Sequence, residues 1–275
     1  MKLLLMPNLD KTGVFSCVES ICNLMSEEAT LLMADTKKEY FKDLPITFGD
    51  FYSLLDEADF CVAIGGDGTI IHVAKHAVSK NKPVIGVNLG RLGFLSAIEP
   101  KELYLLKKLK DGDYITEERM MLSVVHNEKT YFALNDAVLS KGALSKMIDL
   151  DVSCNGSSVG SYRADGIVFS TPTGSTAYNL SAGGPVIDAS VECIAMTPVA
   201  PHSAFSRSII FNADSKITVT PSSEREVFLT VDGEEGIPVN FDDKVDIYKS
   251  DKKLKLINFS GKGFYQVLCD KLLNK

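Results

Sequence analysis

The first 110 residues alternate between short apolar runs and longer stretches in which apolar side chains recur every three or four positions. Residues 1–7 and 30–34 have the composition of β-strands. Between them, residues 14–25 place their apolar side chains on one face of a helix that begins near Gly13. The chain is therefore predicted to open with a strand, a helix and a second strand.

The alternation continues around a group of glycines. A short helical piece at 51–57 leads to Phe60–Ile64, whose unbroken apolar run is typical of a strand buried on both faces. A helix is predicted from Ile70, a strand over 83–87 and another helix over 100–109. Strands that alternate with helices predict an α/β N-terminal domain with a parallel, Rossmann-like sheet.

Near residue 113 the period changes from helical to alternating, and strands with turns dominate until about residue 259. Asn155-Gly156 and Asp232-Gly233 have the composition of hairpin turns, so this region is predicted to be an all-β, sandwich-like antiparallel domain. The stretch 181–196 interrupts the pattern and predicts a helix or a long connection. The predicted strands are 119–125, 130–139, 149–154, 158–163 and 227–231.

From Gly261 the pattern becomes helical again, with Phe264, Val267, Leu268 and Leu272 on one face. This C-terminal helix is expected to pack back on the first domain. No low-complexity linker separates the domains, so we expect them to be firmly apposed with a cleft between them. The expected divisions are 1–113, 114–259 and 260–275.

The composition restricts the class of partner. A net charge of -7 argues against nucleic acid and against an anionic membrane, because both need a basic surface. The apolar start of the chain stops at Pro7, before a signal peptide could develop, and no later run is long enough to span a membrane. We therefore expect a cytoplasmic protein with small-molecule partners.

Cysteine and histidine show no metal-ligand spacing. The six cysteines lack a C-x-x-C pair and are expected to be reduced thiols in the core. His72 and His76 are one helical turn apart but lack a nearby third ligand, so no protein-bound metal is expected.

The sequence Gly-Gly-Asp-Gly-Thr at 65–69 joins the Phe60 strand to the next helix, which Thr69 is expected to cap. Glycines leave N–H groups uncovered at a helix N-terminus, where a phosphate is favoured. Asp67 would repel that phosphate unless a divalent cation stands between them, or unless the carboxylate takes or orients a proton on an acceptor. The alternative is an ordinary turn in which Asp67 satisfies local amides. The spacing fits neither the dinucleotide fingerprint nor the Walker loop.

A second glycine loop, Asn88–Phe94, follows the next strand. Both loops are expected at the carboxyl ends of parallel strands, where such sheets collect ligands. This loop has two possible roles: either Phe94 brings an aromatic edge against a nucleotide base, or the loop only covers the core.

Two stretches of the β-rich region are unusual for a structural sheet. Asn135 and Asp136 are poor strand formers, and together they could hold the hydroxyls of a ribose or form a solvated strand edge. The stretch Arg163–Tyr178 runs through an apolar strand into a hydroxyl-rich loop that ends in an aromatic residue. Such a loop could bind phosphate or base edges while Tyr178 stacks, or it could satisfy its own backbone.

In order and spacing, these motifs resemble the NAD kinase family, and the resemblance covers nearly the whole chain. The glycine motif is shared with diacylglycerol-type lipid kinases and phosphofructokinases, whereas the run from Thr171 to Tyr178 is the specific element. The motifs that carry the resemblance are Gly65–Thr69, Asn135-Asp136, Asp165-Gly166, Ser170–Tyr178, Gly183-Gly184-Pro185 and Pro201-His202-Ser203.

The resemblance implies transfer of the γ-phosphoryl of ATP, or of a phosphoryl of polyphosphate, to the 2′-hydroxyl of the adenosine ribose of NAD, giving NADP. It implies Mg²⁺ or another divalent cation carried with ATP, and a homodimer or homotetramer. Residues 1–113 would form the phosphodonor side and residues 114–259 the NAD side. The rival functions are a lipid kinase with the same glycine turn and a non-catalytic NAD(H)-binding sensor.

The resemblance also implies roles for single residues. Asp67 would be the catalytic base that orients the 2′-hydroxyl, and Gly66, Gly68 and Thr69 would shape the turn beside the phosphates. The implied dinucleotide contacts are Asn135 and Asp136 near the ribose and adenine, Asp165 and Ala177 on the nicotinamide side, Thr173, Thr176 and Tyr178 on the adenosine side, Phe94 over the adenine, and Arg163 at the pyrophosphate or a neighbouring subunit.

Overall fold

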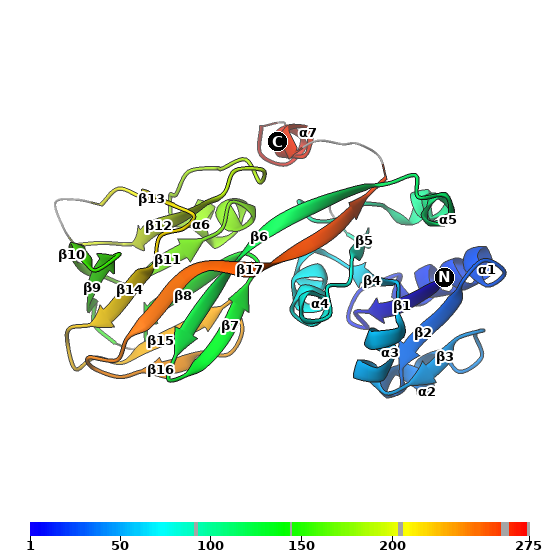
Figure 1. Ribbon diagram of the computed structural model, residues 1–275, viewed down its shortest axis with the longest axis horizontal. Helices are drawn as coiled ribbons and strands as arrows, with labels where there is room; N and C mark the ends of the chain where they lie inside the picture. The colour runs from blue at the N-terminus through cyan, green and yellow to red at the C-terminus, as the bar shows by residue number, and fades with distance from the viewer. Residues whose placement is uncertain (91–92, 144, 203–205, 260–263, 274–275) are drawn as a thin grey trace. The chain divides into compact units, whose positions relative to one another are not determined.

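The structure is a computed structural model that describes residues 1–90, 93–143, 145–202, 206–259 and 264–273. The chain forms two compact units (Figure 1). Unit 1 comprises Met1–Glu118 with Leu254–Lys275, and unit 2 comprises Arg119–Lys253. The chain returns to unit 1 before the expected residue 260, because the end of the last strand pairs there, with Leu256 beside Val84.

Unit 1 contains the predicted parallel sheet, in the order β3-β2-β1-β4-β5. Every residue of β4 is buried, as its continuous apolar run predicted. The strands are β1 (Lys2–Pro7), β2 (Thr30–Ala34), β3 (Thr47–Gly49), β4 (Phe60–Gly65) and β5 (Val84–Asn88).

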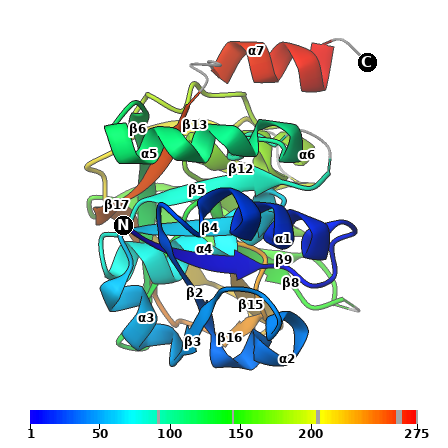
Figure 2. The same cartoon turned by 90° about the vertical axis from the view of Figure 1, so that its right-hand side faces the viewer.

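Successive strand residues point to opposite faces of the sheet, and β4 and β5 are buried along their whole length, so both faces need to be covered. Leu3 and Leu5 pack in one cluster with the apolar face of α1 (Val14–Met25), which runs along the sheet in Figure 2. Helix α4 (Asp67–Ser79) lies against β4 and β5. The remaining helical elements of this unit are η1 (Asp35–Lys37), α2 (Lys38–Phe41), α3 (Phe51–Glu57), η2 (Pro100–Lys107), α5 (Lys108–Asp111), α7 (Phe264–Leu268) and η4 (Cys269–Leu273).

Two predicted helices differ in detail. The helix predicted over 100–109 is a 3₁₀-helix, η2, as far as Lys107 and becomes α-helical at Lys108. The helix predicted from Gly261 is described only from Phe264, since 260–263 lie outside the described residues, as do Arg91 and Leu92 of the second glycine loop.

Unit 2 is the predicted antiparallel sandwich. One sheet has the order β13-β12-β11-β8-β15-β16, and the strands β10, β9, β14 and β17 pair in a second sheet, in which β6 pairs with β17 and β7. Side chains such as Phe169 and Leu150, one from each sheet, share one core. The strands are β6 (Ile115–His126), β7 (Lys129–Ala133), β8 (Asp136–Lys141), β9 (Ile148–Cys154), β10 (Ser157–Ala164), β11 (Gly166–Ser170), β12 (Cys193–Val199), β13 (Ile209–Asn212), β14 (Ile217–Pro221), β15 (Val227–Val231), β16 (Ile237–Val239) and β17 (Val245–Asn258).

Three detailed expectations differ from the structure. The strand predicted over 130–139 is interrupted at Leu134-Asn135, because hydrogen bonds to Asp232 hold that backbone. Residues 182–192 form the long connection expected over 181–196, and only the end of this stretch differs, because β12 begins at Cys193. All six cysteines are free, but Cys154 is only half-buried and Cys269 is exposed, so these two do not belong to the core.

Candidate functional site

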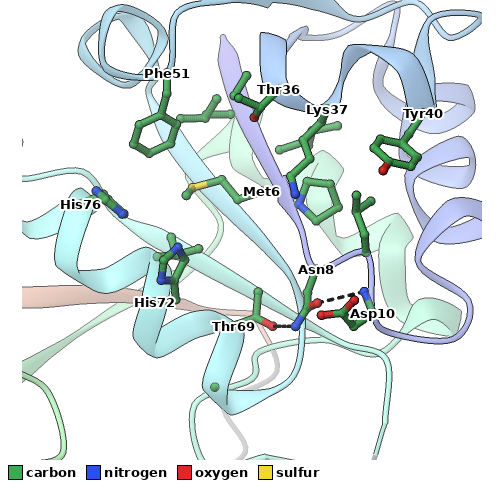
Figure 3. Close-up of a pocket in the computed structure, with 17 residues that line it drawn as sticks. Met6, Asn8, Asp10, Thr36, Lys37, Tyr40, Phe51, Thr69, His72 and His76 are labelled. Atoms are coloured by element: carbon green, nitrogen blue, oxygen red, sulfur yellow. Dashed lines mark hydrogen bonds between the residues drawn. The ribbon is translucent and has the colours of Figure 1, made fainter. Parts of the chain in front are cut away.

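The glycine turn (Gly65–Thr69) joins the buried strand β4 to helix α4. The helix begins at Asp67 and not at Ile70, with Gly66 as its N-cap, so Thr69 lies within the first turn. The Thr69 hydroxyl still serves the helix start, because it accepts a hydrogen bond from the Gly66 amide at 3.4 Å. It also accepts one from Asn8 Nδ2 at 3.2 Å (Figure 3), which ties the turn to the end of β1. Asp67 is the first residue of α4, so its carboxylate lies at the positive end of the helix.

The Asp67 carboxylate accepts hydrogen bonds from the second glycine loop. The Phe94 amide donates to Oδ2 at 2.8 Å, and the Leu95 amide and Ser96 hydroxyl both donate to Oδ1 at 3.3 Å. A Cβ atom on Gly93 would overlap this carboxylate, so only glycine permits the approach. The two loops thus meet, and Asp67 satisfies amides that lie 27 and 28 residues away and not those of its own turn.

A lysine from the C-terminal end of the chain completes this group. Lys271 Nζ lies 3.7 Å from Asp67 Oδ2 and 4.4 Å from the centre of the Phe94 ring. The centre of the Phe264 ring lies 6.1 Å from the centre of the Phe94 ring. The sequence analysis did not identify Lys271, because nothing in the helical pattern of the tail distinguishes this lysine from its neighbours.

A cavity of about 630 Å³ lies on the α4 side of the glycine turn (Figure 3). Its lining includes Gly68 and Thr69 of the turn, together with residues from the ends of β1 and β2. The sequence gives no sign of this cavity, although it shows that two of the lining residues, His72 and His76, are one helical turn apart; their ring centres lie 5.4 Å apart.

In unit 2, Asn135 and Asp136 are held by a carboxylate from a distant turn. Asp232 accepts hydrogen bonds from the amides of Leu134, Asn135 and Asp136 at 2.8, 2.8 and 3.1 Å. Asp136 itself is 5% exposed, and its burial, with a smaller contribution from the charge of Asp232, raises its pKa to about 7. The sequence identifies Asp232 only as a residue of a hairpin turn.

The hydroxyl-rich segment Ser170–Tyr178 packs directly on this pair. Thr171 Oγ1 donates to the Leu134 carbonyl at 2.6 Å, and the Thr171 amide donates to the Asn135 carbonyl at 2.8 Å. Gly174 lies so close to the Asn135 carbonyl that a Cβ atom would overlap it. We refer to residues 134–136 and 170–178 as the hydroxyl-rich cluster. It includes six of the predicted site residues: Asn135, Asp136, Thr173, Thr176, Ala177 and Tyr178.

A buried amide holds the outer side of this cluster. Asn179 is fully buried, donates to the carbonyls of Ser175 and Pro185 at 3.2 and 3.0 Å, and accepts from the Thr197 hydroxyl at 2.7 Å. Its neighbour Tyr178 is 44% exposed, so the ring is available to a ligand. Asn179 was missed because an asparagine after a turn carries no distinctive spacing.

Two of the other predicted residues of unit 2, Arg163 and Asp165, have ion-pair partners. Arg163 forms a two-point pair with Asp149, at 2.7 and 3.1 Å. Asp165 pairs with Lys141 at 2.9 Å. Ala177 is half-buried at the start of α6 (Tyr178–Ser181), inside the cluster. In the region of the chain that the structure describes, Arg163 and Asp165 therefore pair outside the cluster, and their predicted roles at the dinucleotide stay predictions.

Two general features concern membranes and metals. None of the described helices is long and apolar enough to cross a membrane. Among the described residues, no three His, Cys, Asp or Glu side chains are grouped so that they could hold a metal ion.

An α/β unit with a glycine turn at a helix N-terminus, together with a β-sandwich that carries a hydroxyl-rich cluster, is the arrangement expected of a nucleotide-dependent phosphotransferase. Residues 11–114 match the ATP-NAD kinase N-terminal domain, and residues 134–259 match the ATP-NAD kinase C-terminal domain. The chain belongs to the NAD kinase family, as the resemblance of its motifs predicted.

Similar proteins support this membership over the full length. The NAD kinase of Thermoanaerobacter sp. (strain X514) is 37% identical over 284 residues, which covers 100% of this chain and 99% of the relative. That of Caldanaerobacter subterraneus is 41% identical over 229 residues, covering 81% of each chain. The structure of yeast NADH kinase complexed with NADH has a TM-score of 0.87 at 25% identity and covers 100% of this chain and 87% of its own. An NAD kinase from Archaeoglobus fulgidus in complex with ATP has a TM-score of 0.78 at 25% identity, with 100% of both chains covered.

Proposed function

We propose that this protein transfers the γ-phosphoryl of ATP to the 2′-hydroxyl of the adenosine ribose of NAD, giving NADP. The observation that carries the proposal is the match to NAD kinases over the full chain, with Asp67 fixed in the glycine turn at the start of α4. A lipid kinase would share only the glycine turn, and the hydroxyl-rich cluster would have no use in it. A non-catalytic sensor would have no need of the carboxylate.

In the proposed reaction, the 2′-oxygen forms a bond to the γ-phosphorus while the bond from that phosphorus to the β–γ bridging oxygen breaks. The bridging oxygen keeps the electron pair and leaves on ADP, and Asp67 accepts the proton of the 2′-hydroxyl. The transition state is loose, so orientation of the hydroxyl matters more than its early deprotonation. The amides of Phe94 and Leu95 fix the carboxylate for this task.

The charge of the triphosphate requires compensation, and the chain has no Walker lysine. We assign this task to the backbone N–H groups of the glycine turn and to Lys271, which lies 3.7 Å from Asp67. Among the described residues, the turn offers one carboxylate, that of Asp67, with nearby hydroxyls, and no group of protein ligands that could hold a metal ion alone. Mg²⁺ would therefore fit this site as an ion held mainly by the phosphates. The ion would neutralise charge on the β- and γ-phosphates.

The hydroxyl-rich cluster is assigned to the dinucleotide. Asn135 and Asp136 offer an amide and a carboxylate to the ribose hydroxyls, and the exposed Tyr178 ring offers a stacking surface. The remaining assignments rest on the family resemblance: Thr173, Thr176, Ala177 and Asp165 along the dinucleotide, Phe94 over the adenine, and Arg163 at the pyrophosphate or a second subunit. We further propose that the protein forms a homodimer or homotetramer and works in the cytoplasm, where ATP and NAD are available.

The test is an incubation of the purified protein with NAD, ATP and Mg²⁺, followed by detection of NADP with an NADP-specific dehydrogenase. Formation of NADP with no phosphorylation of diacylglycerol is the expected result. Phosphorylation of diacylglycerol alone would identify a lipid kinase. Binding of NAD without any NADP would identify a sensor.

A further inference from the structure

The C-terminal segment, residues 264–273, has an inner and an outer face. It is α-helical over Phe264–Leu268 and continues as a π-helix over Cys269–Leu273. Half-buried side chains recur at 264, 267, 268 and 271, the spacing of one helix face, whereas 265, 266, 269 and 270 are exposed. Three of the four inner positions are apolar and the fourth is Lys271, so a charged side chain occupies a place where the helical pattern favours an apolar one.

The inner face contacts one residue of the second glycine loop, Phe94. The centre of the Phe264 ring lies 6.1 Å from the centre of the Phe94 ring, within the roughly 4.5–7 Å at which aromatic rings attract each other. Lys271 Nζ lies 4.4 Å from the centre of the same ring, close enough for a cation–π contact. An aromatic contact near one end of the segment and a charged contact near the other therefore dock it on Phe94.

Phe94 also contacts Asp67, the proposed catalytic base. Its amide donates a hydrogen bond to Asp67 Oδ2 at 2.8 Å, and Lys271 Nζ approaches that same oxygen at 3.7 Å. Water reaches only part of this pair, since 26% of the lysine side chain and 29% of the aspartate side chain are accessible. A displacement of the segment would remove the lysine from Asp67, while the hydrogen bond from the Phe94 amide would stay.

The segment is too short to keep its place alone. Isolated helices of fewer than about 12–15 residues are marginal in water, so contacts with the rest of unit 1 must hold it. Lys271 is a poor anchor, because a partly exposed ion pair of a long, flexible side chain contributes little to stability. The Phe264 ring is the better anchor. Turns of π-helix are rare and occur frequently at functional sites, which agrees with a role of Lys271 in the reaction.

We propose that Phe264 is a positioning residue, whose ring docks the C-terminal segment on Phe94 and thereby places Lys271 at Asp67. Phe264 acts through Lys271 and not on the reacting atoms. The inference rests on the proposed function for the task of Lys271, which is to compensate the charge of the triphosphate. The docking itself can be measured without turnover.

The first test is a double-mutant cycle. Phe264→Ala and Lys271→Met should each lower kcat about tenfold, with the KM for NAD within about twofold, because both changes remove the lysine from Asp67. For the same reason, the double variant should be no slower than Lys271→Met. Phe264→Trp keeps an aromatic ring and should retain most activity, and Gln266→Ala, on the exposed face of the segment, is the control. A wild-type rate in Phe264→Ala, or a loss of about a hundredfold in the double variant, would overturn the inference.

The second test does not depend on activity. The chain contains no tryptophan, so Phe264→Trp provides a single fluorescent reporter in the full-length protein. Acrylamide should quench this reporter weakly, and about twofold more strongly when Phe94→Ala is added, because the docking partner is then lost. Gln266→Trp, at an exposed position, should be quenched strongly with or without Phe94→Ala. Equal quenching at both positions would contradict the docking. If the wild-type protein makes no NADP while the tryptophan of Phe264→Trp is shielded, the proposed function fails and the docking stands.

Discussion

The glycine turn and the hydroxyl-rich cluster are built in opposite ways. The glycine turn consists of five consecutive residues, and the end of a buried strand and the start of a helix determine its shape. The hydroxyl-rich cluster is assembled from distant segments, since Asp232 bonds to the Leu134 amide 98 residues away. The backbone of the first arrangement is local, and only the Asp67 side chain reaches distant amides, whereas distant side chains hold the backbone of the second.

This difference separates the consequences of mutation. A side-chain change in the glycine turn leaves β4 and the backbone of α4 in place and alters only the hydrogen bonds of Asp67 to Phe94, Leu95 and Ser96, so it should affect catalysis more than folding. A change in the hydrogen bonds that hold the hydroxyl-rich cluster leaves buried polar groups unsatisfied, so it should affect stability and NAD binding together. The following predictions test that separation.

The largest effect is expected from Asp67→Asn. The amide cannot accept a proton from the 2′-hydroxyl, so kcat should fall by about 10³-fold, within the range of general-base catalysis. NAD binding by calorimetry should change little, and Asp43→Asn, at an exposed position, is the control. Wild-type turnover in Asp67→Asn would remove this residue from the mechanism.

The second prediction concerns Asp232→Asn. Asparagine keeps the left-handed backbone at φ 51° but accepts with a single neutral oxygen, so all three amides lose a charged acceptor and at least one loses its acceptor altogether. We expect the free energy of unfolding to fall by about 2 kcal/mol and the KM for NAD to rise about tenfold. Asp242→Asn, at φ 63° and exposed, is the matched control. If Asp232→Asn lost turnover without losing stability, the hydroxyl-rich cluster would not differ from the glycine turn in the way described.

The third prediction uses the pKa of Asp136, which burial and then Asp232 raise from 3.8 to about 7. Between pH 4 and 7 the folded protein keeps a proton on Asp136 that the unfolded chain has lost. Asp136 therefore makes the free energy of unfolding decrease as pH rises, by up to about 1.4 kcal/mol per pH unit, and its contribution levels off above pH 7. Asp136→Asn should lack this slope in urea titrations at pH 5, 6, 7 and 8. If the free energy of unfolding depended on pH in the same way in the wild-type protein and in Asp136→Asn, the prediction would be contradicted.

The sequence predicted what depends on local periodicity. The parallel sheet, the sandwich and the hairpin turn at Asn155-Gly156, where both residues have positive φ, follow from patterns that a few neighbouring residues determine. Asp232, Asn179 and Lys271 were missed because their roles depend on partners far along the chain. The break at Leu134-Asn135 has the same origin, since a distant carboxylate overrides a strong strand sequence.

The fourth prediction concerns Lys271, the distant residue that approaches the glycine turn. Lys271→Met removes a positive charge 3.7 Å from Asp67 Oδ2, so kcat should fall about tenfold while the KM for NAD stays within twofold. Lys271→Arg keeps the charge and should retain most activity. An increase in kcat would instead show that the lysine restrains Asp67 in the free enzyme.

The smallest effect is expected from Arg163→Ala. Its pair with Asp149 is partly exposed, with the arginine side chain 54% accessible, and such pairs contribute no more than about 1 kcal/mol to stability. Urea unfolding should therefore change little in Arg163→Ala and in Asp149→Asn. If the guanidinium also contacts the dinucleotide, only Arg163→Ala raises the KM for NAD, by about threefold, because Asp149→Asn leaves the arginine in place. An equal rise in both variants would mean that the pair acts by positioning β10, and an unchanged KM in both would leave Arg163 with a purely structural pair.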